Sequence, residues 1–397
     1  MIRFYLLILF FLISLLSFLK APTYHLWLLA IGVTEFPLIF AAITTTITLT
    51  GFWAQKFQLA GTLLGVLTIL IFLSPIVRAF WVSNNVKIDM SKAFDGVYGN
   101  GSFVIYPEDK RVAFSIFKLF NKAESNPHTN ITYIKYQDTA MTLDFYSANL
   151  NIRPSTDPPH DLPEAATNKR PCVIVIHGGS WAGGDSQQLP ELNSYLAVKG
   201  YNVASINYRM APKWQTPAPV EDVKNAIAYL KKNADSLHID TNKFVLLGRS
   251  AGAQIALLAA YTLHEKDIKG VIDFYGPSDM VWGYSIPSNP LIMNSRKVME
   301  DYIGGTYKQV PENYYNCSPI EFVSKQSPPT LIIHGENDVL VSREHSRRLN
   351  LKLEHYNIKH YWLQLPWATH GFDYNLNGPG GQLSTYAVET FLDTVCQ

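Results

Sequence analysis

The chain has 397 residues and a formal net charge of +1, from 33 basic and 32 acidic side chains. No long block of one charge is present, so the composition gives no electrostatic basis for binding nucleic acid, and a neutral or weakly charged substrate fits better. The three cysteines, Cys172, Cys317 and Cys396, are widely spaced and form no C-x-x-C pair. The sequence therefore predicts neither a disulfide framework nor a metal site built on cysteine.

Apolar residues are concentrated in the first 80 positions, where they form three runs at residues 4–19, 26–50 and 59–77. A helix that crosses a bilayer needs about 20 apolar residues, and the second and third runs reach that length. The first run is shorter, but no small-residue cleavage site follows it, which favours an uncleaved helix over a secretory signal. Residues 1–80 are thus predicted to form a multi-pass membrane region of two to three transmembrane helices, with the lipid bilayer as a partner.

Two residues interrupt the second apolar run near its middle, Glu35 and Pro37. A carboxylate inside a membrane is a functional candidate, whereas the alternative is a kinked helix whose Glu35 is protonated or satisfied by a neighbouring group. The basic residues that flank the three runs are divided almost evenly between the two sides, so the orientation in the membrane stays open.

A connector is expected at residues 81–129. It contains a glycine cluster, Gly96, Gly99 and Gly101, and an amphipathic stretch at residues 111–120 that predicts one helix. That helix is expected to lie on the membrane, to cover the active site, or to be an ordinary surface helix. Residues 154–163 are expected to form a proline-containing loop.

From residue 130 to residue 397 short apolar runs alternate with helical stretches. Strands are predicted at residues 131–136, 143–146, 173–177, 203–208, 244–247, 270–275, 330–334 and 360–365. Helices are predicted at residues 189–199, 220–233, 250–263, 342–356 and 383–395. This alternation indicates an α/β fold with a mostly parallel sheet covered by helices on both faces, and an antiparallel hairpin of the first two strands at its edge.

The clearest chemical signal is Gly248-Arg249-Ser250-Ala251-Gly252, which follows the strand KFVLL and opens a predicted helix. A G-x-S-x-G motif in this strand–turn–helix setting indicates a nucleophile elbow, in which small flanking residues leave room for a strained turn. Ser250 is therefore the predicted nucleophile.

A serine hydroxyl needs a general base, and the base needs a partner that fixes its tautomer. His370 is the only one of the 11 histidines that follows the last predicted strand, and it is the predicted base. Asp338 directly follows the strand TLIIHG and is the predicted acid, with Glu336 as its local competitor. The order serine, acid, histidine is the one expected for a nucleophile elbow of this kind.

A developing oxyanion requires preorganised N–H donors. The loop His177-Gly178-Gly179-Ser180-Trp181 follows a buried strand, and its glycines allow the backbone to turn its amides toward a substrate. We expect an oxyanion hole from Gly179, Ser180 and Ala251, with Gly178 supporting the loop.

At these motifs the sequence resembles the hormone-sensitive-lipase-like and related carboxylesterase branch of the α/β hydrolases, which includes isoprenylcysteine methylesterases, kynurenine formamidases and feruloyl or acetyl-xylan esterases. The likeness covers residues 131–396 and includes NYRMAP at 207–212 and YGPSDM at 275–280. HGGSW is closer to the H-G-G-x-W of formamidases and methylesterases than to H-G-G-G, which leaves the subfamily open. In related enzymes a helix follows the acid, as one is predicted to do after VLVS here, and this favours Asp338 over Glu336.

The segment 281–323 is rich in Tyr, Asn and Pro and is long enough to form a lid over the active site. Its aromatic residues Trp282, Tyr284 and Tyr302 either line an acyl pocket or pack within the lid. Arg249 either attracts an acidic group of the substrate or pairs with a nearby carboxylate.

The leading hypothesis is a membrane-anchored serine hydrolase that cleaves small-molecule or lipid-like carboxylic esters through an acyl-enzyme on Ser250, without a metal or organic cofactor. Hydrolysis of an amide or formamide is an alternative that the HGGSW loop permits. A second alternative is a non-catalytic binding protein on the same fold, but such proteins usually lose a triad residue and this chain has all three. A transport role is disfavoured because a single carboxylate among three spans makes a poor transport path.

Overall fold

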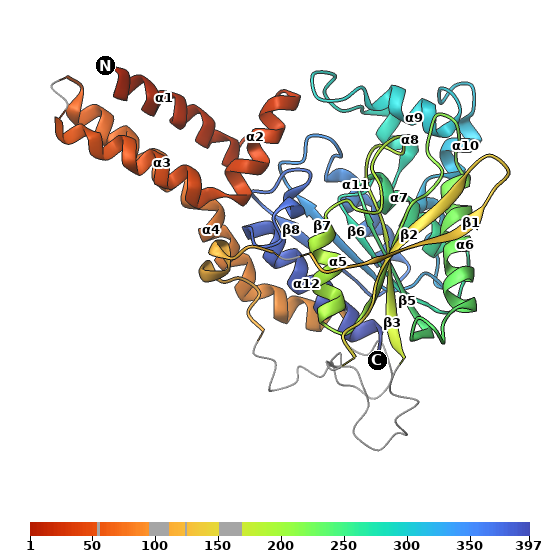
Figure 1. Cartoon of the computed structure of the whole chain (residues 1–397). Coiled ribbons are helices and arrows are strands. Elements are labelled where there is room, and N and C mark those ends of the chain that lie inside the picture. The colour runs from red at the N-terminus through yellow and green to blue at the C-terminus, as the bar shows by residue number, and fades with distance from the viewer. Residues whose placement is uncertain (54–55, 95–110, 124, 151–168) are drawn as a thin grey trace.

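The structure is a computed structural model that describes residues 1–53, 56–94, 111–123, 125–150 and 169–397. The expected glycine cluster at residues 96–101 and the expected loop at residues 154–163 lie outside the described residues. The chain begins in a group of apolar helices and continues into a sheet that is covered by helices, and the two parts lie against each other (Figure 1).

Eight strands of the described residues form one sheet in the order β1-β2-β4-β3-β5-β6-β7-β8. Their bounds are β1 Thr129–Lys135, β2 Ala140–Tyr146, β3 Arg170–Ile176, β4 Asn202–Ile206, β5 Ile239–Arg249, β6 Ile268–Phe274, β7 Thr330–Gly335 and β8 His360–Leu365. The pairs β1–β2 and β2–β4 are antiparallel, and the other neighbouring strands are parallel. The predicted strands and the antiparallel edge hairpin are confirmed.

Helices cover both faces of the sheet, as predicted. One face packs against α6 Ala218–Lys232, α7 Ala251–Thr262 and α11 Glu344–His355, and the other packs against α5 Pro190–Val198, α12 Pro379–Val395 and part of α4 Gln58–Phe94. Strand β3 contributes side chains to the apolar cores on both faces of the sheet. Cys172, Ile174 and Ile176 belong to the core beneath α6, α7 and α11, and Val173 and Val175 belong to the core beneath α5, α12 and α4. Successive side chains of a strand point to opposite faces, so a strand buried on both faces must be apolar throughout.

Helix α4 has 37 residues and belongs to both parts of the molecule. Its second half packs into the core beside α12, where Ile76, Val86 and Phe94 are buried. Its first half leaves Leu59, Leu63 and other apolar side chains exposed, next to α1 Ile2–Ser14 and α3 Pro37–Leu49, which project away from the sheet (Figure 1). The predicted helix at residues 59–77 is present, and it continues through Phe94 into the expected connector.

The second apolar run is broken at the position of Glu35 and Pro37, where the sequence raised the alternative of a kinked helix. It is divided into α2 Tyr24–Glu35 and α3, which meet at Phe36 with a bend of 89°. Pro37 is the first residue of α3, where its missing N–H is tolerated, but its ring is incompatible with a helix that continues from the preceding turn. Because α2 ends at this break, the Glu35 side chain is able to contact Gly380 at the start of α12.

Among the described residues, α4 is the one helix that is long and apolar enough to cross a membrane, judged by length and composition alone. The bent pair of α2 and the stretch Pro37–Trp53 passes the same test only if both pieces are counted as one span, and the first apolar run forms a shorter helix. The multi-pass arrangement predicted from the three runs is thus supported by one helix rather than by three.

The amphipathic stretch at residues 111–120 forms much less helix than expected. Only Ile116–Phe120 is helical, as a short 3-10 helix, η3. Phe114 is buried against Phe80 of α4, and the Ser115 backbone exchanges hydrogen bonds with the Gln382 side chain of α12. These contacts hold the segment extended between α4 and α12.

Replacing Asp273 with Asn is expected to raise the free energy of unfolding, and to raise it more at pH 8 than at pH 5. The Asp273 carboxyl is buried in β6 and accepts one hydrogen bond from the Gly276 amide at 2.7 Å, and its other oxygen has no partner within the described part of the chain. Burial raises its pKa to about 7, against the opposing effects of His334 and of the Gly276 hydrogen bond. A carboxyl whose pKa is raised on folding costs stability increasingly as the pH rises from its unfolded to its folded pKa.

Each unit of this shift corresponds to about 1.4 kcal/mol, so the additional gain between pH 5 and pH 8 should reach a few kcal/mol. Urea unfolding of the detergent-solubilised protein at the two pH values measures the difference. An equal gain at both pH values would contradict a buried, raised carboxyl at this position.

Candidate active site

Ser250 occupies the sharp turn between β5 and α7, with φ 53° and ψ −119°. A non-glycine residue with a positive φ is strained and persists only where the surrounding structure enforces it. The Ser250 N–H donates to the Phe274 carbonyl at 2.9 Å. A Cβ at Gly248 would overlap the backbone of α7, and one at Gly252 would overlap carbonyl oxygens at the end of β3. Both glycines of the motif are therefore required by the space around the turn.

The structure brings the three predicted triad residues together. The His370 Nε2 atom lies 2.9 Å from the Ser250 Oγ atom, and the His370 Nδ1 atom lies 2.7 Å from the Asp338 Oδ2 atom. The residues come from three segments that meet at the carboxyl edge of the sheet: the turn after β5, the loop after β7 and the loop after β8. His370 and Asp338 are both almost fully buried.

The surroundings of Asp338 determine where the proton of His370 resides. The Asp338 Oδ1 atom accepts hydrogen bonds from the Leu340 and Val341 amides, both at 2.9 Å. Burial alone would raise the pKa of Asp338, but electrostatic attraction to the His370 ring and hydrogen bonds from His334 and His370 outweigh it and hold this pKa well below its usual range. An ionised Asp338 only accepts, so the Nδ1 atom of His370 donates to it and the Nε2 atom is left to accept from Ser250.

Glu336, the local competitor of Asp338, points elsewhere. Its carboxylate pairs with Arg343 at 3.3 Å and is partly exposed. Asp338, two residues further along the loop, is thus the residue whose carboxylate points toward His370.

The loop after β3 has an unusual backbone, with positive φ angles at Gly179, Ser180 and the following tryptophan. The Gly178 amide donates to the Gln188 Oε1 atom at 2.8 Å, so it holds the loop in place and does not face the pocket. Ser180 and Ala251 line the cavity beside Ser250. The expected oxyanion donors Gly179, Ser180 and Ala251 therefore lie on turns that border the candidate nucleophile.

Trp181 anchors this loop through contacts that sequence reasoning did not identify. Its indole N–H donates to the Gln254 Oε1 atom at 2.9 Å, and its ring stacks on Tyr302 with centroids 4.5 Å apart. Gln254 in turn donates to the Cys317 carbonyl at 2.7 Å. The only sequence signal for this network was the tryptophan of HGGSW, since Gln254 lies in an apolar helix and Tyr302 in the expected lid.

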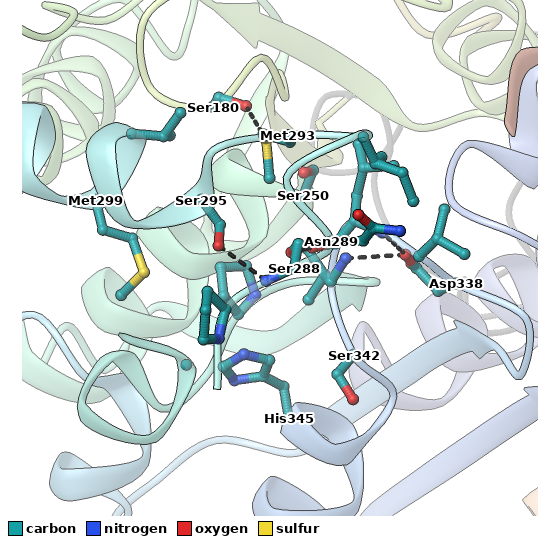
Figure 2. A pocket seen from close by; sticks show the side chains of 18 of the residues that line it. Ser180, Ser250, Ser288, Asn289, Met293, Ser295, Met299, Asp338, Ser342 and His345 are labelled. Carbon is teal, nitrogen blue, oxygen red and sulfur yellow. Dashed lines mark hydrogen bonds between the residues drawn. The ribbon is translucent and has the colours of Figure 1, made fainter. Parts of the chain in front are cut away.

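A cavity of about 410 Å³ opens beside Ser250. Figure 2 shows Ser180, Ser250 and Met293 around it, with His345 and Ser342 on another side. Its lining is mostly apolar and comes from the loop after Ser180, from the residue range 286–299 and from the loop after β7. Three residues before α2, Lys20, Ala21 and Pro22, also line it. Sequence reasoning did not connect this N-terminal segment with the site.

The aromatic residues of the expected lid pack within the fold. Tyr302 is buried under Trp181, Tyr284 packs against Tyr314, and Trp282 packs against His345. None of these three aromatic residues is among the side chains that line the described cavity. Of the two interpretations of Trp282, Tyr284 and Tyr302, the structure supports internal packing.

Arg249 pairs with a carboxylate, the second of the two alternatives. Its Nε atom lies 2.6 Å from the Asp373 Oδ2 atom, and both side chains are buried. The Tyr275 hydroxyl also donates to Asp373. Because Arg249 precedes Ser250 and Asp373 follows His370, this buried pair links the two segments that carry the serine and the histidine.

Comparison with known proteins agrees with this arrangement. A family model described as BD-FAE matches residues 161–353. The esterase LipC of Mycobacterium tuberculosis is 31% identical over 252 residues, which cover 59% of this chain and 60% of LipC. The chain thus matches less than two thirds of this relative's length.

Solved structures show the same fold. An esterase of Pyrobaculum calidifontis superposes with a TM-score of 0.55 at 21% identity, covering 69% of this chain and 87% of that one. A butyrate-bound esterase of Thermogutta terrifontis gives a TM-score of 0.51 at 19% identity, covering 66% of this chain and 91% of that one. The chain has the α/β-hydrolase fold, with a mixed, mostly parallel sheet preceded by an N-terminal helical region.

Asp338→Asn is expected to reduce ester turnover by about a thousandfold or more while the protein stays folded. Asn can donate to His370, which favours the tautomer that cannot accept the serine proton. The matched control is Glu336→Gln, which should retain turnover within a factor of about three because Glu336 contacts Arg343 on the outside of the loop. Equal losses in the two variants, measured as kcat with p-nitrophenyl butyrate, would exclude the assigned role of Asp338.

Proposed function

We propose that this chain is a serine carboxylesterase that cleaves carboxylic esters through an acyl-enzyme on Ser250. The observation that carries the proposal is the hydrogen-bonded series Asp338, His370 and Ser250 at the edge of an apolar cavity. The likeness to LipC and to the family model supports the same reaction class. The roles of the individual residues follow from this geometry.

In the first half of the reaction the Ser250 Oγ atom attacks the ester carbonyl carbon and His370 Nε2 takes its proton. Asp338 stabilises the imidazolium that forms. The amides of Gly179, Ser180 and Ala251 stabilise the negative charge on the former carbonyl oxygen. When the tetrahedral intermediate collapses, His370 returns the proton to the leaving alcohol and the acyl group stays on Ser250.

In the second half a water molecule attacks the acyl-enzyme, with His370 as its general base. Collapse of the second intermediate releases the carboxylic acid and returns the proton to Ser250. Because His370 alternates between base and acid, a fixed orientation of its ring is needed in both half-reactions.

The cavity favours an uncharged, apolar acyl group. Its volume lies in the range of small-molecule sites, and its lining includes Ile292, Met293 and Met299. His345 also faces it, but burial, and to a lesser extent the neighbouring His334 and Arg348 side chains, lower the pKa of His345 to about 3, so this histidine is neutral at physiological pH. Short- to medium-chain or lipid-like esters are the proposed substrates.

The N-terminal helices attach the enzyme to a lipid bilayer in this proposal. Support comes from the length and composition of α4 and from exposed apolar side chains on α1 and on the first half of α4, which are costly in water. Residues 1–80 then form the membrane region, residues 81–129 connect it to the catalytic domain at 130–397, and residues 281–323 cover the pocket as a lid.

The detergent-solubilised protein is expected to hydrolyse p-nitrophenyl acetate, butyrate and decanoate, with all turnover abolished in Ser250→Ala. The length profile should favour butyrate or a longer chain over acetate, because a longer chain fills more of the apolar cavity. A fluorophosphonate probe should label the wild type and leave Ser250→Ala unlabelled.

Turnover of N-formylkynurenine above that of every ester would favour formamide hydrolysis instead. A folded protein that neither turns over any ester nor reacts with the probe would exclude the catalytic proposal and favour a binding function.

A further inference from the structure

Helix α2 contacts the candidate catalytic histidine directly. The Trp27 indole N–H donates to the backbone carbonyl of His370 at 2.9 Å, and the two rings lie 6.4 Å apart between centroids. The Ile31 side chain of the same helix lies over Gly371, the next residue of the loop. The apolar helices are thus in contact with the loop whose geometry the reaction depends on.

The C-terminal end of α2 holds the other end of this loop. The buried Glu35 carboxyl accepts a hydrogen bond from the Gly380 amide at 2.8 Å, in the first turn of α12. The Glu35 carbonyl accepts from the Asn375 side chain at 2.8 Å. Glu35, which interrupts the apolar run, therefore serves as an anchor between α2 and the segment that follows His370.

The N-terminal side of α2 forms one wall of the pocket. Lys20, Ala21 and Pro22 line the cavity. This wall is tied to the opposite loop, since the Asn289 side chain donates to the Pro22 carbonyl at 3.1 Å and the Tyr24 N–H donates to the Leu291 carbonyl at 3.2 Å. Ala21 is buried, so the wall is closed at this point.

We propose that the N-terminal helical region is a working part of the active site as well as a membrane attachment. In this proposal Trp27 is a positioning residue that fixes the His370 loop, and the wall formed by Ala21 and Pro22 limits the length of the acyl chain. The proposal rests on the esterase function proposed above. It follows from two independent observations, a hydrogen bond to the backbone of His370 and a lining contributed by residues 20–22.

The two constraints on His370 act on different parts of the residue. Asp338 holds the ring at Nδ1, whereas Trp27 holds the backbone carbonyl. The Arg249–Asp373 pair holds the loop three residues further on, so Trp27 is the contact of α2 that acts on the backbone of His370 itself. Misplacement of a catalytic group by about 1 Å is enough to cost about a hundredfold in rate.

The first test is Trp27→Phe in the full-length, detergent-solubilised protein, which removes the N–H donor and keeps an aromatic ring. We expect kcat for p-nitrophenyl butyrate to fall by about tenfold or more, while KM and the thermal unfolding midpoint change little. The matched control is Trp81→Phe, an exposed tryptophan on α4, which should leave kcat unchanged. Wild-type kcat in Trp27→Phe, or a loss matched by a lower unfolding midpoint, would overturn the positioning role.

The second test is Ala21→Phe, which places a larger side chain in the pocket wall. Turnover of the decanoate ester should fall at least about tenfold more than turnover of the acetate ester, because the added ring occupies space needed only by the longer chain. Ala42→Phe, on an exposed position of α3, is the control and should leave the ratio unchanged. An unchanged ratio of decanoate to acetate turnover in Ala21→Phe would exclude the proposal that this wall limits the length of the acyl chain.

Failure of this inference can be distinguished from failure of the proposed function. If the wild type hydrolyses esters and both Trp27→Phe and Ala21→Phe behave like it, the esterase stands and the role of the N-terminal region is excluded. If the wild type has no Ser250-dependent turnover and Ser250 does not react with a fluorophosphonate, the esterase itself is excluded.

Discussion

The strained turn at Ser250 is the constraint on which the rest of the site depends. A positive φ at a serine is tolerated because the surrounding backbone packs closely on both sides: a side chain at Gly248 would overlap α7, and one at Gly252 would overlap the end of β3. The energy that holds the turn comes from the sheet core, where large apolar surfaces of β3, β5 and β6 are removed from water. Rigid strands thus fix the serine, and loops supply the groups that act on it.

The loop that carries His370 is less rigid by nature, and it is held from two directions. On the side of the sheet, the buried Arg249–Asp373 pair connects it to the residue before the nucleophile. On the side of the N-terminal helices, Trp27 and Glu35 bind the backbone on either side of it. A buried ion pair is weak evidence for added stability, but removing one partner leaves an uncompensated buried charge, so Asp373 is held beside Arg249.

Helix α4 connects the N-terminal helices to the sheet, because it packs against both. Its first half has the composition of a membrane span and its second half buries Val86 and Phe94 in the same core as α12. Because one helix contributes to both parts, the apolar helices are joined to the sheet core by continuous backbone as well as by side-chain contacts. Arg78, at the middle of α4, bonds both Ser17 of the N-terminal segment and Pro366 in the loop before His370. Arg78 thus connects the segment before α2 with the loop that leads to His370.

Local patterns in the sequence determined the strands, the covering helices, the edge hairpin and the turn at Ser250, because each depends on residues close together in the chain. The sequence favours Asp338 over Glu336 as the acid, and in the structure Asp338 contacts His370 whereas Glu336 pairs with Arg343. Glu35 and Pro37 signalled the break between α2 and α3. No local pattern indicated that Glu35 would then contact Gly380 at the start of α12. The contact between Trp27 and His370 joins residues 343 positions apart, and no local pattern encodes such a pair. The chemistry of the sequence alone thus pointed to the candidate reacting groups, whereas only tertiary packing brings the apolar N-terminal helices into contact with the candidate site, because these contacts join residues far apart in the chain.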